Sequence, residues 1–451
     1  MKNIAVIGTG YVGLVVAVGL ADFGNQVTGV DIDDAKIAKL KKGKLPFHEP
    51  GLKDYLETNI ESGRLNFTRD VSSTIAKSSV VFLAVGTPPK RDGSANLEYL
   101  ESSVDAIAEY ARSYTLVVTK STVPVGTNRA LGKRIRARGA AAEIEMVSNP
   151  EFLREGRAVQ DFFHPDRIVI GTESERAKKI LGGIYSALRL NEVPFVWCGM
   201  ETAELIKYTT NAFLAMKVTF INQMANLADK VGADIAVIAK SMGMDGRIEG
   251  KFLHPGPGFG GSCFSKDIRA LALTGDNFGV DMSLVKTVAT ANEVQKTRVV
   301  MKLRGLLGGR FHGLSIAVLG LAFKSNTDDV RESPALKVVA DLLEGGALVR
   351  AHDPQAMDNF RMIFPAISYC ASGYETMKDA DAVLILTEWN EYRSLDFSLM
   401  NKMMRGRVLL DTRNLLNARL ARAHGFIYRG NGRDIDSVKK DRDGAQAPIF
   451  P

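Results

Sequence analysis

Cysteine and histidine are scarce in this sequence, and their scarcity excludes several kinds of protein. The 451 residues contain three cysteines and six histidines. Cys198, Cys263 and Cys370 are widely spaced, so they do not make a disulfide framework and they suit a cytoplasmic protein. They form no metal-ligand pair and the histidines show no HxxxH spacing, so we expect no metal. A chain of this length divides into two or three domains.

A long run of basic residues is also missing, although the formal net charge is +7. Such an excess of positive charge can favour binding to nucleic acid, to a membrane surface or to a small phosphorylated ligand. Because the lysines and arginines are scattered, we expect a small anionic ligand, no nucleic acid and no membrane. The apolar stretch at residues 4–24 has the length of a signal peptide or a membrane span, but its glycines favour a nucleotide-binding turn.

The glycines of this stretch have the spacing of a dinucleotide-binding turn. A short apolar run leads into Gly8, Gly10 and Gly13, and a helical pattern and a second short strand ending in Asp31 follow. The first glycine permits the tight turn, the second lets the backbone approach a pyrophosphate, and the third lets the helix pack on the strand. A carboxylate at Asp31 suits a ribose 2′-hydroxyl and repels a 2′-phosphate, so we expect NAD.

Three later apolar runs, at residues 80–89, 115–127 and 144–156, end in small, polar or proline residues. They predict further strands of a doubly wound parallel sheet. In such a sheet ligands bind at the carboxyl ends of the strands. The side chains expected to line this binding cleft are Thr87, Ser121, Thr122, Glu151 and Glu155.

A long helix is predicted from about Glu201 to Val231, where proline and glycine are absent and apolar residues recur at helical period. After Arg310 the first pattern returns, with a strand, a glycine turn at Gly320, a helix and a strand ending in Asp353. The GxGxxG spacing is missing there, which indicates a different nucleotide ligand. The predicted fold is α/β, with two Rossmann-like doubly wound domains joined by a long central helix.

Cys263 lies between the two predicted nucleotide folds, in the glycine-rich stretch GPGFGGSCFSKD. An enzyme that oxidises an alcohol only to a carbonyl needs no thiol. Oxidation onward to an acid requires a group that adds to the aldehyde. A thiolate adds as a thiohemiacetal, which loses a second hydride and leaves a thioester for water to cleave. We therefore interpret Cys263 as a nucleophile, whose thiolate Lys266 stabilises. Cys198 and Cys370 are interpreted as small buried apolar residues.

Ordered motifs from the first strand to about Asn414 resemble those of the nucleotide-sugar dehydrogenases that make uronic acids. They include GTGYVG, EPGL, VGTP, KSTVPVGT, NPEFLREG, AELIKYTTNAFLA, GFGGSCF, GLAFK and TDDVRESPA. The resemblance implies a four-electron oxidation of UDP-glucose to UDP-glucuronate with two NAD. It also implies a homodimer or a higher homo-oligomer.

Three domains are predicted on this basis. Residues 1–200 form an NAD-binding Rossmann domain, and residues 201–305 form a central helical linker and dimerisation domain with the catalytic cysteine loop. Residues 306–451 form a C-terminal Rossmann-like domain that binds the nucleotide sugar. The polar tail after about Asn431 is expected to be flexible.

The resemblance also implies roles for the matching residues. Cys263 forms the thiohemiacetal and the thioester, and Lys207 and Asn211 stabilise oxygen at the reacting carbon. Glu151 is the base for thioester hydrolysis, and Arg247 reaches across a subunit interface to the substrate phosphates. The remaining catalytic residues, which position water and move protons, are Asp267 and Thr122. The implied cofactor contacts are Gly8, Gly10, Tyr11, Val12, Gly13, Asp31, Lys36, Gly86, Thr87, Ser121, Thr122, Glu155, Lys266 and Arg331. The implied substrate contacts are Glu151, Phe152, Leu153, Lys207, Asn211, Arg247, Phe252, Gly260 and Lys324.

Two positions depart from the family pattern. Ser265 stands where a proline usually follows the cysteine and phenylalanine, and its loss frees the loop backbone around Cys263. Gln223 stands where the family often has glutamate, which leaves one charge fewer near the far end of the long helix.

Other functions stay open at this point. GDP-mannose and UDP-N-acetylhexosamine dehydrogenases share the architecture and the cysteine. A two-electron hydroxyacid dehydrogenase also uses a lysine and an asparagine on a long helix, but it leaves Cys263 unexplained. A non-catalytic dinucleotide-binding protein need not keep the thiol, the lysine and the carboxylates together. The number of NADH formed per substrate separates these functions. It is two for the four-electron dehydrogenases, one for a two-electron dehydrogenase and none for a non-catalytic protein.

Overall fold

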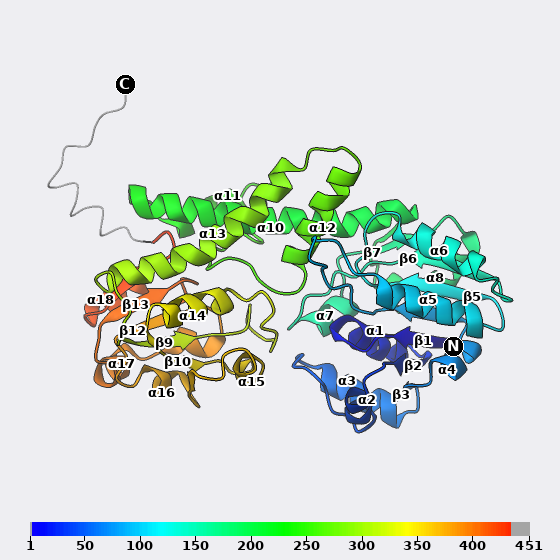
Figure 1. The fold of residues 1–451 in the computed structure, drawn as a ribbon, viewed down its shortest axis with the longest axis horizontal. Helices are drawn as coiled ribbons and strands as arrows, with labels where there is room; N and C mark the ends of the chain where they lie inside the picture. The colour runs from blue at the N-terminus through cyan, green and yellow to red at the C-terminus, as the bar shows by residue number, and fades with distance from the viewer. Residues whose placement is uncertain (1, 434–451) are drawn as a thin grey trace. The chain divides into compact units, whose positions relative to one another are not determined.

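The computed structural model describes residues 2–433, and the tail predicted to be flexible lies almost wholly outside the described residues. The chain divides into two units (Figure 1). The first runs to Thr210 and also includes Arg269–Asp281; the second holds Asn211–Ile268 and continues from Met282. Each unit contains its own mainly parallel sheet, and a 32-residue helix belongs in part to each. The predicted α/β fold with two Rossmann-like domains and a long helix is confirmed.

An eight-stranded sheet organises the first unit, in the order β3-β2-β1-β4-β5-β6-β7-β8. Its strands pair in parallel except for β6 and β7, which are antiparallel. The order β3-β2-β1-β4-β5-β6 is the doubly wound arrangement that the glycine turn predicts. The strands are β1 (Asn3–Ile7), β2 (Gln26–Val30), β3 (Leu65–Thr68), β4 (Val80–Leu83), β5 (Thr115–Thr119), β6 (Ile144–Ser148), β7 (Ile168–Gly171) and β8 (Phe195–Cys198).

Helices cover both faces of this sheet (Figure 1), because successive residues of each strand point to opposite faces and both sets are apolar. Ile4 and Val6 pack with α1, α3, α7 and α8, whereas Ala5 and Ile7 pack with α4, α5 and α6. The helices are α1 (Tyr11–Asp22), α2 (Asp34–Lys41), α3 (Leu52–Glu61), α4 (Val71–Lys77), α5 (Glu98–Tyr110), α6 (Thr127–Ala137), α7 (Ala158–Phe163), α8 (Glu175–Ile184) and α9 (Ser186–Leu190).

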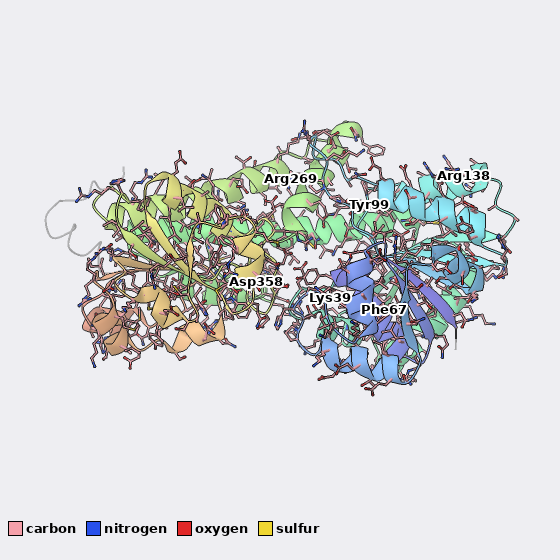
Figure 2. The ribbon with its side chains drawn as sticks, turned by 60° about the horizontal axis from the view of Figure 1, so that its bottom comes forward. Lys39, Phe67, Tyr99, Arg138, Arg269 and Asp358 are labelled. Atoms are coloured by element: carbon pink, nitrogen blue, oxygen red, sulfur yellow. The ribbon has the colours of Figure 1, made fainter. Side chains whose placement is uncertain are left out.

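The basic side chains of the first unit come from separate elements, as Figure 2 shows for three of them. Lys39 lies on α2, Arg138 ends α6 and Arg269 lies on α12 (Phe264–Asn277), and all three are exposed. By contrast, Phe67 of β3 is buried and its ring lies against the backbone of Gly29. These three basic side chains therefore lie on separate elements.

The central part of the chain is helical. Helix α10 (Met200–Val231) matches the long helix predicted from Glu201 to Val231, and α11 (Ile235–Gly243), α12 and α13 (Ser283–Leu306) follow. Within residues 2–433, no helix combines the length and the apolar character needed to cross a membrane.

The second unit contains a six-stranded parallel sheet in the order β11-β10-β9-β12-β13-β14. One apolar core joins this sheet to its helices and to α13. The strands are β9 (Ser315–Leu319), β10 (Leu348–His352), β11 (Ser368–Tyr369), β12 (Ala382–Ile385), β13 (Val408–Asp411) and β14 (Ile427–Gly430). The helices are α14 (Pro334–Glu344), α15 (Met357–Arg361), α16 (Gly373–Met377), the 3₁₀ helix η1 (Asn390–Ser394), α17 (Phe397–Met403) and α18 (Ala418–Ala423).

Candidate active site

The glycine turn after β1 has the geometry of a phosphate cradle. Gly8 has a φ of +93°, and a Cβ there would lie 2.7 Å from the carbonyl oxygen of Ala84. A Cβ on Gly13 would lie 1.8 Å from the carbonyl oxygen of Gly8, so the helix can approach the turn only with glycine at this place. Gly10 has no described atom within 4 Å of its Cβ position, and α1 begins at the next residue. Open space beside free helix N–H groups fits a pyrophosphate.

Asp31 is held rigidly just after β2. Its Oδ2 accepts hydrogen bonds from Thr9 N (2.9 Å), Thr9 Oγ1 (2.8 Å) and Lys36 Nζ (2.9 Å). Its Oδ1 accepts a bond from Asp33 N at 3.1 Å. Burial acts to raise the pKa of Asp31, but these hydrogen bonds outweigh it, and the pKa lies below its usual value. The carboxylate is therefore ionised at neutral pH and beside the glycine turn, as the NAD prediction requires.

The ends of β4 and β5 are tied to one another at the same edge of the sheet. The hydroxyl of Thr87 donates to the carbonyl of Thr122 at 2.9 Å, and the hydroxyl of Ser121 donates to the carbonyl of Val85 at 2.7 Å. Gly86 has no described atom within 4 Å of its Cβ position. These segments therefore form a second open wall of the proposed cofactor site.

Glu151 and Lys207 form a buried ion pair in the first unit. Lys207 Nζ donates to Glu151 Oε1 at 3.0 Å, and the side chains are 4% and 6% exposed, respectively. The other carboxylate oxygen of Glu151 accepts a hydrogen bond from Leu153 N at 2.5 Å. The Nζ of Lys207 lies 5.3 Å from the ring centroid of Phe152, whose face also carries the guanidinium of Arg167. The structure thus brings together four residues that the resemblance assigns to substrate.

Glu49 of the EPGL motif has a structural role that the sequence did not indicate. Its carboxylate accepts hydrogen bonds from Gly156 N and Ala158 N, both at 2.7 Å, and the residue is buried. It therefore fixes the start of α7 and the NPEFLREG segment that carries Glu151 and the half-buried Glu155.

Cys263 directly precedes the first turn of α12 in the second unit. Its sulfur lies 3.7 Å from the hydroxyl oxygen of Ser262, and its carbonyl accepts a hydrogen bond from Asp267 N at 2.9 Å. A helix N-terminus favours a thiolate because its free N–H groups and dipole stabilise negative charge. Cys263 is half-buried.

Asp267 links Cys263's helix to α10. Its Oδ2 accepts a hydrogen bond from Asn211 Nδ2 at 2.6 Å, and its Oδ1 accepts one from Lys266 Nζ at 2.7 Å. Asp267 is 1% exposed and Asn211 is also buried. The structure therefore joins three predicted site residues, and both oxygens of this buried carboxylate have a donor.

The loop that carries Cys263 is fastened to the C-terminal sheet domain of the same unit. Gly261 N donates to the carbonyl of Arg331 at 2.9 Å. A Cβ on Gly260 would lie 2.5 Å from the carbonyl oxygen of Glu332, and one on Gly261 would lie 2.8 Å from the ring of Phe323. These contacts show why glycine occupies positions 260 and 261.

Three amides that were not predicted hold the same loop. Asn292 of α13 donates to the carbonyl of Phe259 at 3.0 Å and accepts from its N–H at 2.8 Å. Asn222 accepts from Gly256 N at 2.7 Å, and Gln295 donates to the carbonyl of Gly256 at 3.0 Å. The sequence alone did not identify these amides as anchors, because only the structure shows that they are buried and must therefore be hydrogen-bonded.

Backbone strain occurs at two residues that bear on this loop. Of the seven residues other than glycine with left-handed φ values within residues 2–433, these are Phe252 (65°) and Glu332 (53°). Such conformations persist only where neighbouring contacts impose them, and they are frequent at functional sites. Phe252 is a predicted substrate contact, and Glu332 packs on Gly260.

The predicted phosphate and nucleotide contacts of the second unit lie in different surroundings. Lys324 is half-buried, with its Nζ 5.3 Å from the ring centroid of Phe323. Arg331 pairs with Asp329 at 2.7 Å, and Arg247 is largely exposed and pairs with Asp245 at 2.6 Å. The two cofactor contacts predicted in this unit are Lys266 and Arg331.

Arg413, which follows β13, was not among the site residues predicted from the sequence. Its Nε donates to the carbonyl of Leu386 at 2.8 Å, and NH2 donates to the carbonyl of Phe323 at 3.2 Å. A Cβ on Gly256 would lie 2.9 Å from its NH1. The signal that could have found it is an arginine directly after a predicted strand, in "VLLDTRN".

Asp353 holds the turn after β9 in the second Rossmann-like domain. Its Oδ2 accepts hydrogen bonds from the backbone of Leu321 (2.7 Å) and Ala322 (3.0 Å) and from the indole of Trp389 (3.0 Å). The residue is fully buried. Asp353 therefore binds the turn after β9, as Asp31 binds Thr9 in the turn after β1.

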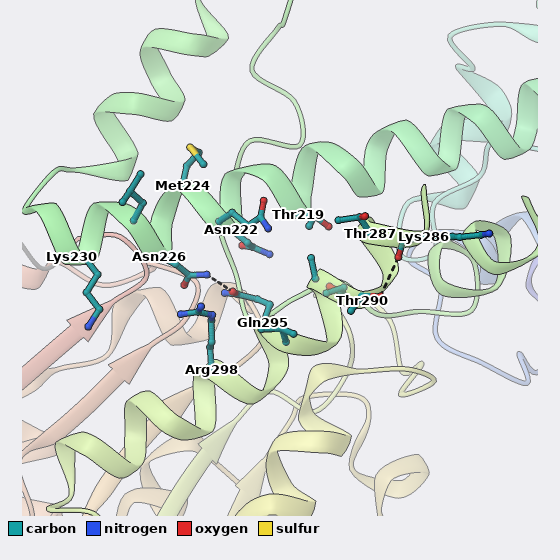
Figure 3. Close-up of a pocket in the computed structure, with 15 residues that line it drawn as sticks. Thr219, Asn222, Met224, Asn226, Lys230, Lys286, Thr287, Thr290, Gln295 and Arg298 are labelled. Carbon is teal, nitrogen blue, oxygen red and sulfur yellow. Dashed lines mark hydrogen bonds between the residues drawn. The ribbon is translucent and has the colours of Figure 1, made fainter. Parts of the chain in front are cut away.

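The two departures from the family pattern fall in defined places. Ser265 lies in the first turn of α12. The N–H groups of a first turn have no acceptor within the helix, so proline, which lacks an N–H, and serine both fit at this position. Gln223 lines a cavity of about 870 Å³ between α10 and α13 (Figure 3). In that cavity Asn226 donates a hydrogen bond to Gln295 at 2.8 Å.

The fold and its glycine turn define an NAD-dependent oxidoreductase with two Rossmann-like domains. Three models of the UDP-glucose/GDP-mannose dehydrogenase family match the chain. The NAD binding domain matches residues 2–189, the central domain 201–294 and the UDP binding domain 317–418. The chain belongs to this family.

Relatives and solved structures match the chain over nearly its whole length. It is 48% identical to UDP-glucose 6-dehydrogenase of Rhizobium meliloti (strain 1021), over 96% of this chain and 99% of that protein. It is 42% identical to UDP-glucose 6-dehydrogenase TuaD of Bacillus subtilis (strain 168), over 96% of this chain and 94% of that protein. A UDP-glucose dehydrogenase structure from Pyrobaculum islandicum aligns with a TM-score of 0.89 at 39% identity, over 96% of this chain and 98% of that one.

Proposed function

We propose that this protein oxidises UDP-glucose to UDP-glucuronate with two NAD, through a thiohemiacetal and a thioester on Cys263. The observation that carries the proposal is the position of Cys263 at the start of α12, one turn before the Asp267 carboxylate that Asn211 and Lys266 hold. The identity to relatives named UDP-glucose 6-dehydrogenase supports the choice of substrate.

The chemistry at Cys263 follows from the need to oxidise one carbon twice. Bound NAD supplies the hydride acceptor at each of the two oxidations. After the primary alcohol has lost a hydride and a proton, the Cys263 thiolate adds to the aldehyde carbon and an oxyanion forms. Loss of the second hydride from that carbon leaves a thioester. Water then adds to the thioester carbon, the C–S bond breaks, and the thiolate and a carboxylate are released.

The two buried clusters take complementary roles in this proposal. Lys207 and Asn211 are four residues apart on α10, so they share a helix face, and both donate hydrogen bonds suited to an oxyanion. Glu151 is the base for water attack on the thioester. Asp267 orients Asn211, and Thr122 positions water. Lys324, Phe252 and Gly260 contact the nucleotide sugar, and Arg331, Lys36 and Glu155 contact the cofactor.

We assign residues 1–200 to NAD binding, residues 201–305 to the central helical domain and residues 306–451 to nucleotide-sugar binding. All three cysteines lie within residues 2–433 and none of them forms a disulfide there, which supports a place in the reducing cytoplasm. We also propose a homodimer or higher homo-oligomer in which a second copy covers the groove of α10 and α13. Leu227 and Val294 line that groove and are exposed.

The stoichiometry of NADH tests the proposal. We expect two NADH per UDP-glucose consumed in the wild type. Cys263→Ser should abolish turnover or stop it at a covalent ester, because a serine alkoxide is a poorer leaving group than a cysteine thiolate and water therefore cleaves the ester more slowly than the thioester. The matched control is Cys198→Ser, since burial raises the pKa of the Cys198 thiol and disfavours a thiolate there.

Other stoichiometries contradict the proposal in distinct ways. One NADH per substrate, or normal turnover of Cys263→Ser, removes the thiol from the chemistry and indicates a two-electron dehydrogenase. If UDP-glucose yields no NADH while GDP-mannose or a UDP-N-acetylhexosamine yields two, the substrate is wrong and the thiol chemistry stands.

A further inference from the structure

Lys120 is a buried lysine that the proposed reaction has not used. It directly follows β5, and its backbone N–H donates to the carbonyl of Leu83 at 2.8 Å. The residue is 6% exposed, and its ammonium lies 5.9 Å from the ring centroid of Tyr185, which is itself buried. Among residues 2–433, no carboxylate or hydrogen-bond acceptor pairs directly with this ammonium.

A lysine in such surroundings destabilises the fold when it is charged. An ammonium removed from water without a direct partner loses hydration that a cation–π contact only partly replaces. Burial, together with the ammonium of Lys207, lowers the pKa of Lys120 to about 8, against the opposing effect of the Glu151 carboxylate. A methionine of similar length would fill the same space without this penalty, so the charge calls for a functional reason.

The charged groups that act on Lys120 are those of the proposed chemistry. Lys120 lies beside the segment that carries Glu151, because Asn149 N donates to the carbonyl of Thr119 at 2.9 Å and the hydroxyl of Tyr185 donates to Asn149 Oδ1 at 2.8 Å. The charges of the Lys207–Glu151 ion pair described above both act on the Lys120 ammonium. With Lys120 protonated, this Lys–Glu–Lys cluster has two ammonium groups and one carboxylate. It then has one surplus positive charge inside the protein. With Lys120 neutral, the surplus disappears.

We propose that Lys120 is a positioning residue that acts through the Lys207–Glu151 pair: its ammonium gives the cluster the surplus positive charge that favours an oxyanion beside Lys207. This inference rests on the proposed function, because it takes Lys207 to contact oxygen at the reacting carbon. A fixed positive charge in a water-poor site favours a developing oxyanion far more than the same charge in water does.

The pH dependence of kcat tests the proposal. In the wild type, kcat should fall as the pH rises through about 8, because Lys120 then loses its proton. Lys120→Met should lower kcat at pH 7 by about tenfold, leave KM within about twofold, and remove that fall from the profile. Lys120→Arg keeps the charge and does not deprotonate in this range, so it should stay active to higher pH.

Thr119→Val is the matched control, because Thr119 is the preceding residue, is buried and does not belong to the cluster. Its side chain points to the opposite face of β5, and its profile should follow the wild type. Lys120→Gln serves as a second neutral variant, and retention of NAD binding shows that each variant is folded.

The outcomes separate this inference from the function on which it rests. A wild type that forms two NADH, with the same pH profile in Lys120→Met as in the wild type, overturns the role of Lys120 alone. A parallel loss in Lys120→Met and Lys120→Arg indicates packing and also overturns it. A wild type that forms no NADH with any nucleotide sugar contradicts the proposed function, and the role of Lys120 falls with it.

Discussion

At the scale of single residues, Lys120 predicts a pH dependence of stability that is independent of any substrate. Its pKa of about 8 in the folded protein lies below the ordinary lysine value of 10.5. Between these two values the unfolded chain binds more protons than the folded one, so stability rises with pH across this window. The penalty of burying the charge, about 3 kcal/mol, is full below pH 8 and is relieved as the pH approaches 10.5.

Lys120→Met should therefore be more stable than the wild type at pH 7, and the two should converge towards pH 10. Thermal unfolding of both proteins at several pH values measures this difference, and other lysines cancel in the comparison. Melting curves that differ by the same amount at every pH would show that Lys120 is already neutral or well solvated.

The same scale shows what single residues of the sequence could and could not reveal. The tight turn at Gly8, the open space at Gly10 and the position of Asp31 beside the turn were predictable because they follow from local spacing. Lys120 stood in the quoted motif KSTVPVGT, but its burial comes from strand pairing and from Tyr185, which is distant in sequence. Asn292 was not predictable either, because a polar residue on a helix is usually solvated.

At the scale of elements, α10 stabilises the start of α6 through Glu204. Its carboxylate accepts hydrogen bonds from Gly126 N (2.6 Å), Asn128 N (2.8 Å) and Asn128 Nδ2 (2.7 Å), and the residue is buried. Burial raises the pKa of Glu204, and these hydrogen bonds oppose it. The long helix thereby supplies a cap that α6 lacks, since its own N-cap residue is Gly126.

Glu204→Ala should loosen the first turn of α6, because the half-buried N–H of Gly126 and two buried N–H donors of Asn128 lose their acceptor, at about 1–3 kcal/mol for each buried donor. Hydrogen exchange of the peptide covering residues 124–131 should accelerate about tenfold or more. Glu201→Ala is the control one turn earlier, where an exposed carboxylate pairs with Arg129 and its loss should change exchange little. Equal acceleration in both variants would refute the capping role.

The helices and strands themselves were largely predictable, because period and turn residues are local signals. The helix predicted from Glu201 to Val231 is α10, and the predicted strand runs contain β4, β5 and β6. The hydrogen bonds of Asp353 were not predictable in the same way. The sequence placed Asp353 at the end of a strand, but its bond from the indole of Trp389 joins residues that are distant in sequence.

At the scale of the whole molecule, the proposed homo-oligomer would bring Arg247 to the active site of the partner chain. Its side chain is 89% exposed, and its described ion pair is with the nearby Asp245. The groove of α10 and α13 exposes Leu227 and Val294, which a second copy would bury. Leu227→Glu should therefore yield a smaller species in analytical ultracentrifugation and lower activity, because each site loses the partner's Arg247. A monomeric wild type, or an unchanged oligomer in Leu227→Glu, contradicts this surface as the interface.

Mixed oligomers distinguish an arginine that acts across the interface from one that acts within its own chain. We expect Arg247→Ala and Cys263→Ser each to be inactive alone, and we expect co-expression of the two chains to restore activity. In a mixed dimer, the chain with an intact cysteine receives Arg247 from its partner, whereas the other site has both defects. Random pairing makes half of the dimers mixed, so about one quarter of wild-type activity should return. If Arg247 serves its own chain, every site in the mixture has one defect, and no activity returns.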